Sequence, residues 1–179
     1  MKYKKLIDEL QECGVIKFGD FSLTSGIKSK YYIDVKKAIT RPKILELICE
    51  QIIDIIVDQN IKVDYIACVE LGAVPIGTII SIKTGLPLII IRKTEKNHGL
   101  ENRIIGDPEK TKIALLVEDI TTTGGSVIDA VGVMRNEGLI VKNVISVVDR
   151  GEGAKESIEK ECLNITSLVK IEDLISLIV

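Results

Sequence analysis

Residues 118 to 126, EDITTTGGS, contain more chemically active groups than an ordinary loop requires. Two adjacent acids, Glu118 and Asp119, end an aliphatic run, and hydroxyls and two glycines follow before an apolar segment resumes. Glycines let the backbone approach a ligand closely, and the N–H groups at the start of a helix favour an anion. The acids instead suit vicinal hydroxyls or a divalent cation. A ligand with both a phosphate and a sugar diol, such as a ribose phosphate, satisfies the whole stretch.

Two other phosphate-binding motifs are absent from the chain. It contains neither GxxxxGK[ST], which excludes a P-loop, nor GxGxxG, which excludes the dinucleotide fingerprint. The alternative to a ligand site is an ordinary strand-to-helix loop in which one Thr or Ser caps the helix. That role needs far fewer of these residues than the stretch contains.

The elements that must position these residues follow an α/β pattern. Segments of helical content separate four short aliphatic runs, which are residues 63–69, 87–92, 112–118 and 141–149. Such alternation is typical of a parallel sheet with helices on both faces. Functional loops in these sheets follow the carboxyl ends of the strands, and here they begin at Glu70, Arg92, Glu118 and Asp149.

The first 40 residues differ in character from the rest. Residues 3–12 have apolar positions at helical spacing, and residues 15–40 are polar and turn-rich, which favours a small hairpin or hood. Thr40 is expected to be the N-cap of the helix that follows. We therefore expect a single domain over residues 1–179, with an N-terminal helix and hood (1–40) and an α/β core (41–179).

The stretch EDITTTGGS resembles the phosphoribosyl-pyrophosphate (PRPP) motif of the type I phosphoribosyltransferases, and other stretches narrow the resemblance. The segments FSLTSGIKSKYYID (21–34), ELGAVP (70–75), RKTEKNHG (92–99) and VVDRGEGA (147–154) resemble parts of the orotate phosphoribosyltransferases in the same order. The resemblance covers nearly the whole chain. It implies the type I phosphoribosyltransferase fold, with a central parallel sheet flanked by helices and a small N-terminal hood.

The resemblance also implies a reaction. Orotate and PRPP, with Mg²⁺, would give orotidine 5′-phosphate and pyrophosphate in pyrimidine (UMP) biosynthesis. The two acids would hold the ribose hydroxyls and the turn behind them the 5′-phosphate. The implied PRPP site comprises Glu118, Asp119, Ile120, Thr121, Thr122, Thr123, Gly124, Gly125 and Ser126. Mg²⁺ would bind mainly through substrate oxygens, so no protein ligand is assigned to it. A homodimer with shared active sites is implied as well.

A cluster of basic residues follows the second aliphatic run: Arg92, Lys93, Lys96 and the only histidine, His98. In such a transferase they could stabilise the negative charge that builds on the departing pyrophosphate, which makes them the candidate catalytic residues. The polar loop 93–110 would serve as a lid that excludes water. A solvated charged loop is the alternative, because Glu95 and Glu101 partly neutralise the cluster.

Orotate carries a carboxylate, so its pocket should supply hydrogen-bond donors. Arg150, at the end of the fourth aliphatic run, could form a fork of hydrogen bonds to a carboxylate or a pyrimidine carbonyl. A solvent-facing arginine is the alternative. The resemblance implies that Arg150 and Thr122 contact orotate. Ser25 and Gly26 could add backbone N–H groups, and Lys28 lies close by in the sequence, which completes the candidate orotate site. Thr24 and Leu71-Gly72 depart from the family pattern, and each departure removes a possible cation near the base.

Two rival functions stay open. One is a phosphoribosyltransferase for a purine base. The other is a regulator that binds PRPP without catalysis, although the intact basic cluster argues against it because a sensor has little use for leaving-group chemistry.

Composition argues against other classes of function. The net charge of −2, from 26 acids against 24 bases, gives no general attraction to nucleic acid or to anionic membranes. The four cysteines form no CxxC pair and are expected to be reduced, buried thiols. Neither a signal-peptide pattern nor an apolar stretch of bilayer-spanning length is present. We expect a soluble, cytoplasmic protein whose partners are PRPP, orotate and a second copy of itself.

Overall fold

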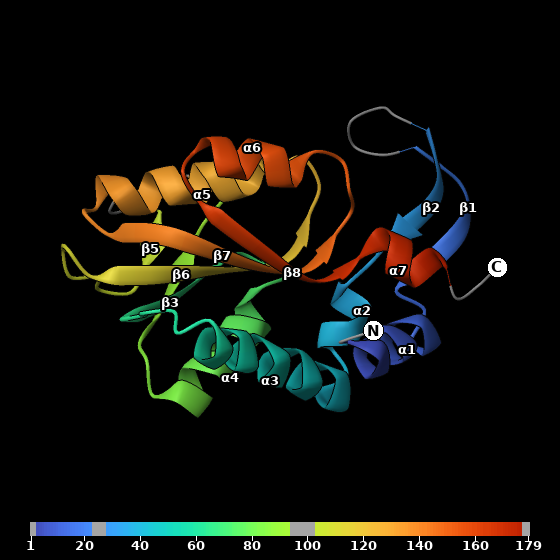
Figure 1. The fold of residues 1–179 in the computed structure, drawn as a ribbon, viewed down its shortest axis with the longest axis horizontal. Helices are drawn as coiled ribbons and strands as arrows, with labels where there is room; N and C mark the ends of the chain where they lie inside the picture. Colours follow the sequence, from blue (N-terminus) through green and yellow to red (C-terminus); the bar gives the residue numbers. More distant parts are fainter. Residues whose placement is uncertain (1–2, 23–27, 94–102, 177–179) are drawn as a thin grey trace.

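The computed structural model describes residues 3–22, 28–93 and 103–176. At its centre, six described strands form a sheet in the order β5-β4-β3-β6-β7-β8 (Figure 1). Neighbouring strands are parallel except for β4 and β5, which are antiparallel. The strands are β3 (Tyr65–Val69), β4 (Leu88–Ile91), β5 (Ile104–Ile105), β6 (Ile113–Thr121), β7 (Ile140–Asp149) and β8 (Asn164–Lys170).

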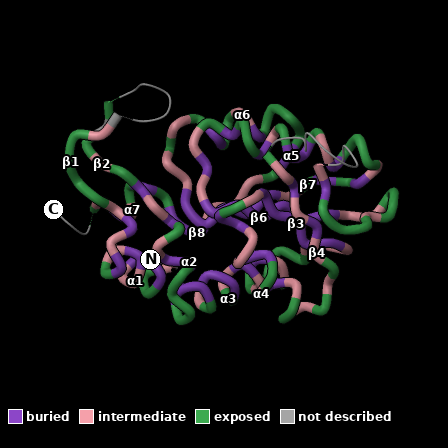
Figure 2. The backbone as a smooth tube through the Cα atoms, turned by 180° about the vertical axis from the view of Figure 1, so that it is seen from behind, coloured by how far each residue is buried: buried purple, intermediate pink, exposed green. Residues whose placement is uncertain are grey.

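Helices cover both faces of this sheet. The helices α3 (Pro42–Asp58) and α4 (Val74–Thr84) lie on one face, and α5 (Gly125–Asn136) and α6 (Ala154–Lys160) lie on the other (Figure 1). Along β6, Leu115 and Val117 join the core under α3 and α4, whereas Ala114 and Leu116 join the core under α5 and α6. Because both faces are buried (Figure 2), the inner strands β3 and β4 are unbroken apolar runs and β6 begins as one.

The N-terminal part forms a small unit at one end of the sheet (Figure 1). It contains the helix α1 (Lys4–Glu12), an antiparallel hairpin of β1 (Ile16–Ser22) and β2 (Lys28–Ile33), and the short helix α2 (Lys36–Ile39). The last described helix, α7 (Ile171–Ile175), lies beside α1, where Gln11 Nε2 donates a hydrogen bond of 2.6 Å to the Leu174 carbonyl. The expected hood is therefore present, and the C-terminal helix packs against it.

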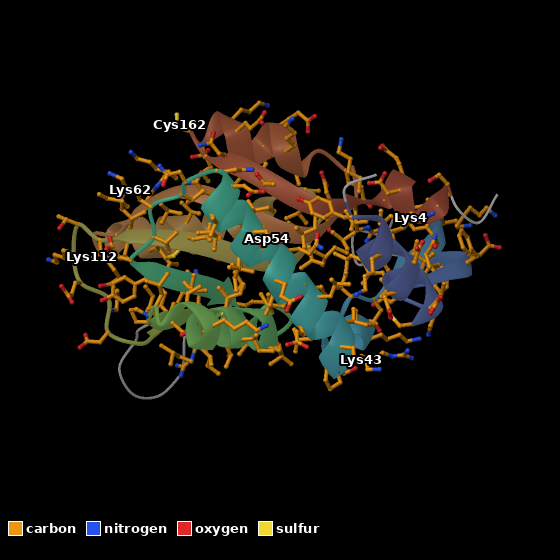
Figure 3. The ribbon with its side chains drawn as sticks, turned by 60° about the horizontal axis from the view of Figure 1, so that its bottom comes forward. Lys4, Lys43, Asp54, Lys62, Lys112 and Cys162 are labelled. Carbon is orange, nitrogen blue, oxygen red and sulfur yellow. The ribbon has the colours of Figure 1, made fainter. Side chains whose placement is uncertain are left out.

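The outer surface carries most of the charge. Lys43 and Asp54 project from the outer side of α3 (Figure 3). All four cysteines are free thiols, and Cys13, Cys49 and Cys68 are buried as expected. Cys162 is exposed, contrary to expectation, because it lies in the turn that follows α6. No helix within residues 3–22, 28–93 and 103–176 combines the length and apolarity that crossing a bilayer requires.

The expected α/β architecture is confirmed, and three local details differ. Each of the four aliphatic runs forms a strand, but β5 and β8 were not predicted. The strand β5 has only two residues, and β8 mixes polar with apolar residues, so neither produces an aliphatic run. The prediction that Thr40 caps α3 is wrong. Its hydroxyl donates to the Lys37 carbonyl (3.0 Å) at the end of α2, and Arg41 is the N-cap of α3 without a side-chain hydrogen bond.

Candidate active site at the carboxyl edge of the sheet

The two acids of the EDITTTGGS stretch lie within β6, which continues to Thr121, beyond the predicted run that ended at Glu118. Glu118 and Asp119 are only 6 % and 7 % exposed. A Glu118 carboxylate oxygen accepts the Asp119 N–H (3.1 Å), and an Asp119 oxygen accepts the Ile120 N–H (3.0 Å). These bonds fix both carboxylates against the strand while leaving other lone pairs for a ligand.

Asp119 packs directly against Gly72, in the loop that follows β3. A Cβ atom added to Gly72 would lie 1.9 Å from Asp119 Oδ2, which is far inside any tolerated contact. A side chain at position 72 would therefore displace the carboxylate. This close approach gives a structural reason for the glycine at position 72, because any side chain there is incompatible with the observed position of Asp119.

Burial changes the protonation of Glu118. Burial raises the pKa of the Glu118 carboxyl well above its ordinary value, and the hydrogen bond and negative charge of Asp119 raise it further. Lys93 acts in the opposite direction by stabilising the carboxylate form. Glu118 thus holds a proton near neutral pH when no ligand is bound. Loss of that proton would let the pair accept more hydrogen bonds from a ligand.

The turn behind the acids leads into α5. Gly124 has φ +87° and lies against Ile158, so a side chain there would be strained by its backbone and crowded by α6. Helix α5 begins at Gly125, and no side chain caps its first turn. The residues from Ile120 to Val127 enclose a small cavity of about 70 Å³. The N–H groups of this first turn are therefore suited to an anion such as a phosphate.

Thr121 borders the small cavity, but its hydroxyl has a structural role. The side chain is buried, with its Oγ1 3.4 Å from Ser146 Oγ and 3.5 Å from the Val148 carbonyl oxygen. These contacts join the end of β6 to β7. Thr122, Thr123 and Ser126 are less buried and are better placed to meet a ligand.

A larger cavity of about 540 Å³ adjoins the small one, because Ile120, Thr122 and Ser126 line both. Its lining also includes Lys36, Glu70, Leu71, Gly72, Lys93, Glu118 and Asp119. The Lys93 N–H donates to Glu70 Oε1 (2.9 Å), which ties the end of β4 to the loop after β3. The structure thus brings the two acids, the phosphate-type turn and a candidate catalytic lysine into one cavity.

Sequence reasoning did not single out Lys36 and Glu70 as site residues. Glu70 had a usable signal, because it begins one of the four loops at the carboxyl edge of the sheet. Lys36 had none, because it begins α2 in the N-terminal unit and reaches the cavity only through the packing of that unit.

Arg150 lies at the end of β7, beside the turn. Its N–H donates to the Thr121 carbonyl (3.0 Å), and its side chain is only 10 % exposed. Nη2 is 2.8 Å from Glu152 Oε1, yet neither Nη2 nor Nε makes an aligned hydrogen bond. Buried guanidinium donors without such bonds suit an anionic ligand. Arg150 is not part of the lining of the 540 Å³ cavity, so any ligand it binds extends beyond that space.

The remaining predicted residues lie elsewhere. Lys28 is exposed on β2 and lines neither cavity, and the Arg92 side chain does not line them either. Another cavity of about 460 Å³ at the ends of β7 and β8 contains none of the predicted residues. The predictions for Ser25, Gly26, Lys96 and His98 lie outside the described residues.

Known proteins resemble this chain in both sequence and fold. Residues 36–174 match the family model described as the phosphoribosyl transferase domain. The chain is 50 % identical to the orotate phosphoribosyltransferase of Methanocaldococcus jannaschii over 173 residues, which cover 97 % of each chain. It is 49 % identical to the orotate phosphoribosyltransferase of Pyrococcus horikoshii over 175 residues, which cover 97 % of this chain and 94 % of the relative.

A solved structure extends the comparison to three dimensions. The Mycobacterium tuberculosis orotate phosphoribosyltransferase in complex with PRPP superimposes with a TM-score of 0.79 at 29 % identity, over 97 % of this chain and 99 % of that one. The α/β fold, the paired acids with their turn, and the near-complete coverage by relatives agree with one another. The chain therefore belongs to the phosphoribosyl transferase domain family, among the orotate phosphoribosyltransferases.

Proposed function

We propose that the protein transfers the ribose 5-phosphate group of PRPP to orotate, giving orotidine 5′-phosphate and pyrophosphate in pyrimidine biosynthesis. One observation carries the proposal. A single cavity joins a buried carboxylate pair, the uncapped first turn of α5 and the cation Lys93, and these are the groups that a phosphorylated sugar with a departing anion requires. The orotate phosphoribosyltransferases among its relatives support the choice of base.

The carboxylates of Glu118 and Asp119 accept hydrogen bonds from the ribose hydroxyls. Both are held by backbone N–H groups, so they need little rearrangement when the sugar arrives. Glu118 gives up its proton on binding, because a protonated carboxyl has less capacity to accept.

The 5′-phosphate binds in the turn from Thr122 to Ser126. The free N–H groups of the first turn of α5 and the helix dipole favour the anion, and the neighbouring hydroxyls donate further hydrogen bonds. The dianionic phosphate therefore anchors one end of the substrate and sets the position of the anomeric carbon.

Lys93 and Lys36 supply positive charge to the pyrophosphate. Both line the larger cavity together with three carboxylates, those of Glu70, Glu118 and Asp119. As the bond from the anomeric carbon to pyrophosphate breaks, charge builds on the leaving group, and fixed cations stabilise it more in the transition state than in the ground state. Arg92, Lys96 and His98 stay predictions for the same task.

The donor set of the cavity fits Mg²⁺, which prefers carboxylate oxygens and keeps several waters. Among the described residues no group of three or more His, Cys, Asp or Glu side chains could hold a metal ion. Asp119 and Glu118 would therefore share the ion with substrate oxygens. When bound, Mg²⁺ neutralises charge on the pyrophosphate.

Arg150 binds the orotate side of the reaction through its Nε and Nη2 donors, with Thr122 on the facing turn. The experiment that tests the proposal is a steady-state assay with PRPP and Mg²⁺ against orotate, uracil, hypoxanthine, guanine and adenine. Orotidine 5′-phosphate should form fastest. Faster turnover of a purine would overturn the choice of base, and PRPP binding without any product would point to a regulator.

The proposal includes a homodimer with shared active sites. Mixing a Lys96→Ala variant with an Asp119→Asn variant should then restore activity that neither has alone, because hybrid dimers regain one intact site. Light scattering of the wild-type protein gives the assembly mass. A monomer, or two variants that stay inactive when mixed and shown to form hybrids, would refute the shared site.

A further inference from the structure

Arg103 connects the two ends of the segment between β4 and β5. Its Nε and Nη2 donate to the Arg92 carbonyl (3.0 and 2.8 Å), and Nη2 also lies 3.2 Å from the Lys93 carbonyl oxygen. The Arg92 N–H donates in turn to the Arg103 carbonyl (2.8 Å). One side chain, only 16 % exposed, therefore satisfies two backbone carbonyls immediately after β4.

The same guanidinium reaches across to α5. Its Nη1 is 3.0 Å from Asp129 Oδ1 and its Nη2 is 2.5 Å from Asp129 Oδ2, which is the bidentate geometry of a strong arginine–carboxylate pair. The hydrogen bond from Arg103 lowers the pKa of the Asp129 carboxyl, which keeps the pair charged. Asp129 lies about one turn beyond Gly125, the first residue of α5.

These contacts hold Lys93 from both sides. Its N–H donates to Glu70, in the loop after β3, and its carbonyl accepts from Arg103, which is anchored on α5. The Lys93 side chain lines the cavity and acts on the Glu118 carboxyl. These contacts therefore link the backbone of Lys93 to α5, the helix whose first turn is the proposed binding site of the 5′-phosphate.

We propose that Arg103 and Asp129 are positioning residues that fix Lys93 relative to the first turn of α5 and so set the distance between the leaving-group cation and the phosphate anchor. The inference rests on the proposed function, which supplies both substrate groups. Asp129 is 55 % exposed, and such pairs contribute little to overall stability. The Arg103–Asp129 pair therefore acts mainly by fixing the position of Lys93, and its loss should lower the rate of the chemical step.

Arg103→Ala and Asp129→Asn test the proposal, with Arg135→Ala as the matched control. Arg135 lies on α5, as Asp129 does. Like Arg103, it donates to two backbone carbonyls, those of Val141 and Glu161, but these lie away from the cavity. We expect Arg103→Ala to lower kcat by about tenfold with little change in KM for orotate, because a small misplacement of a catalytic group is costly. Asp129→Asn should lower kcat less, and Asp129→Glu should retain more activity than Asp129→Asn. Arg135→Ala should keep the wild-type kcat.

A double-mutant cycle with Lys93→Ala separates positioning from general stability. If Arg103 acts through Lys93, removing it in the Lys93→Ala background should lower kcat no further. Fully additive losses, or equal kcat for the Arg103→Ala and Arg135→Ala variants, would overturn the inference. Failure of the wild-type protein to form orotidine 5′-phosphate would instead refute the proposed function, so the two failures are distinguishable.

Discussion

The contact between Gly72 and Asp119 allows a sharp test of the site. An alanine Cβ at position 72 would lie 1.9 Å from Asp119 Oδ2, whereas real Cβ contacts are essentially never below 3.0 Å, so the carboxylate must move by more than about 1 Å. A misplacement of that size costs on the order of 100-fold in rate, or about 2.7 kcal/mol of transition-state stabilisation. We therefore expect Gly72→Ala to lower kcat/KM for PRPP by about 100-fold, measured in steady-state assays.

Two further variants establish the cause. Gly132, exposed in α5 with no atom near its would-be Cβ, is the control, and Gly132→Ala should keep full activity and gain about 0.5–1 kcal/mol of unfolding free energy. In an Asp119→Ala background the clash is gone, so adding Gly72→Ala should cost no further activity. Wild-type kcat/KM in the single Gly72→Ala variant would refute the claim that Asp119 must occupy its observed position.

Four more predictions concern charge. Because burial raises the pKa of Glu118, PRPP binding near neutral pH should release a proton, detectable by calorimetry in buffers of different ionisation enthalpy, and Glu118→Gln should remove that release. Above the ordinary pKa of glutamate, Glu118 stays protonated in the folded state but is ionised in the unfolded state. The unfolding free energy of the ligand-free protein should therefore fall as pH rises through this region. A rise in the unfolding free energy of the wild type relative to that of Glu118→Gln would contradict the shift in pKa. Lys36 lines the larger cavity, so Lys36→Ala should raise the dissociation constant for PRPP about tenfold. Lys37→Ala should leave that constant unchanged, because the Lys37 ammonium lies 3.4 Å from the Gly14 carbonyl oxygen. Equal effects of the two substitutions would show that Lys36 does not contact PRPP. Arg150→Ala should raise KM for orotate on the order of 10- to 100-fold and KM for PRPP much less, and parallel rises in both constants would count against a base-binding role.

Several parts of the fold were predictable because their signals are local. Strands buried on both faces are largely apolar, so each of the four aliphatic runs became a strand, and the helices α4 and α5 follow the first and third runs. The strands β5 and β8 lacked such a signal. The two-residue strand β5 forms because it pairs with β4, and the partly polar strand β8 forms because it pairs with β7.

The amino-acid sequence by itself determined the chemistry at the end of β6, because two acids, three threonines and two glycines all lie within residues 118–125 and need only a strand and a helix to present them. Only the tertiary structure decided which distant groups complete the site. Gly72 against Asp119, Lys36 in the cavity, and Arg103 between Lys93 and Asp129 are contacts between residues far apart in the chain. Such contacts depend on strand order and helix packing, which leave no periodic signal in a single sequence.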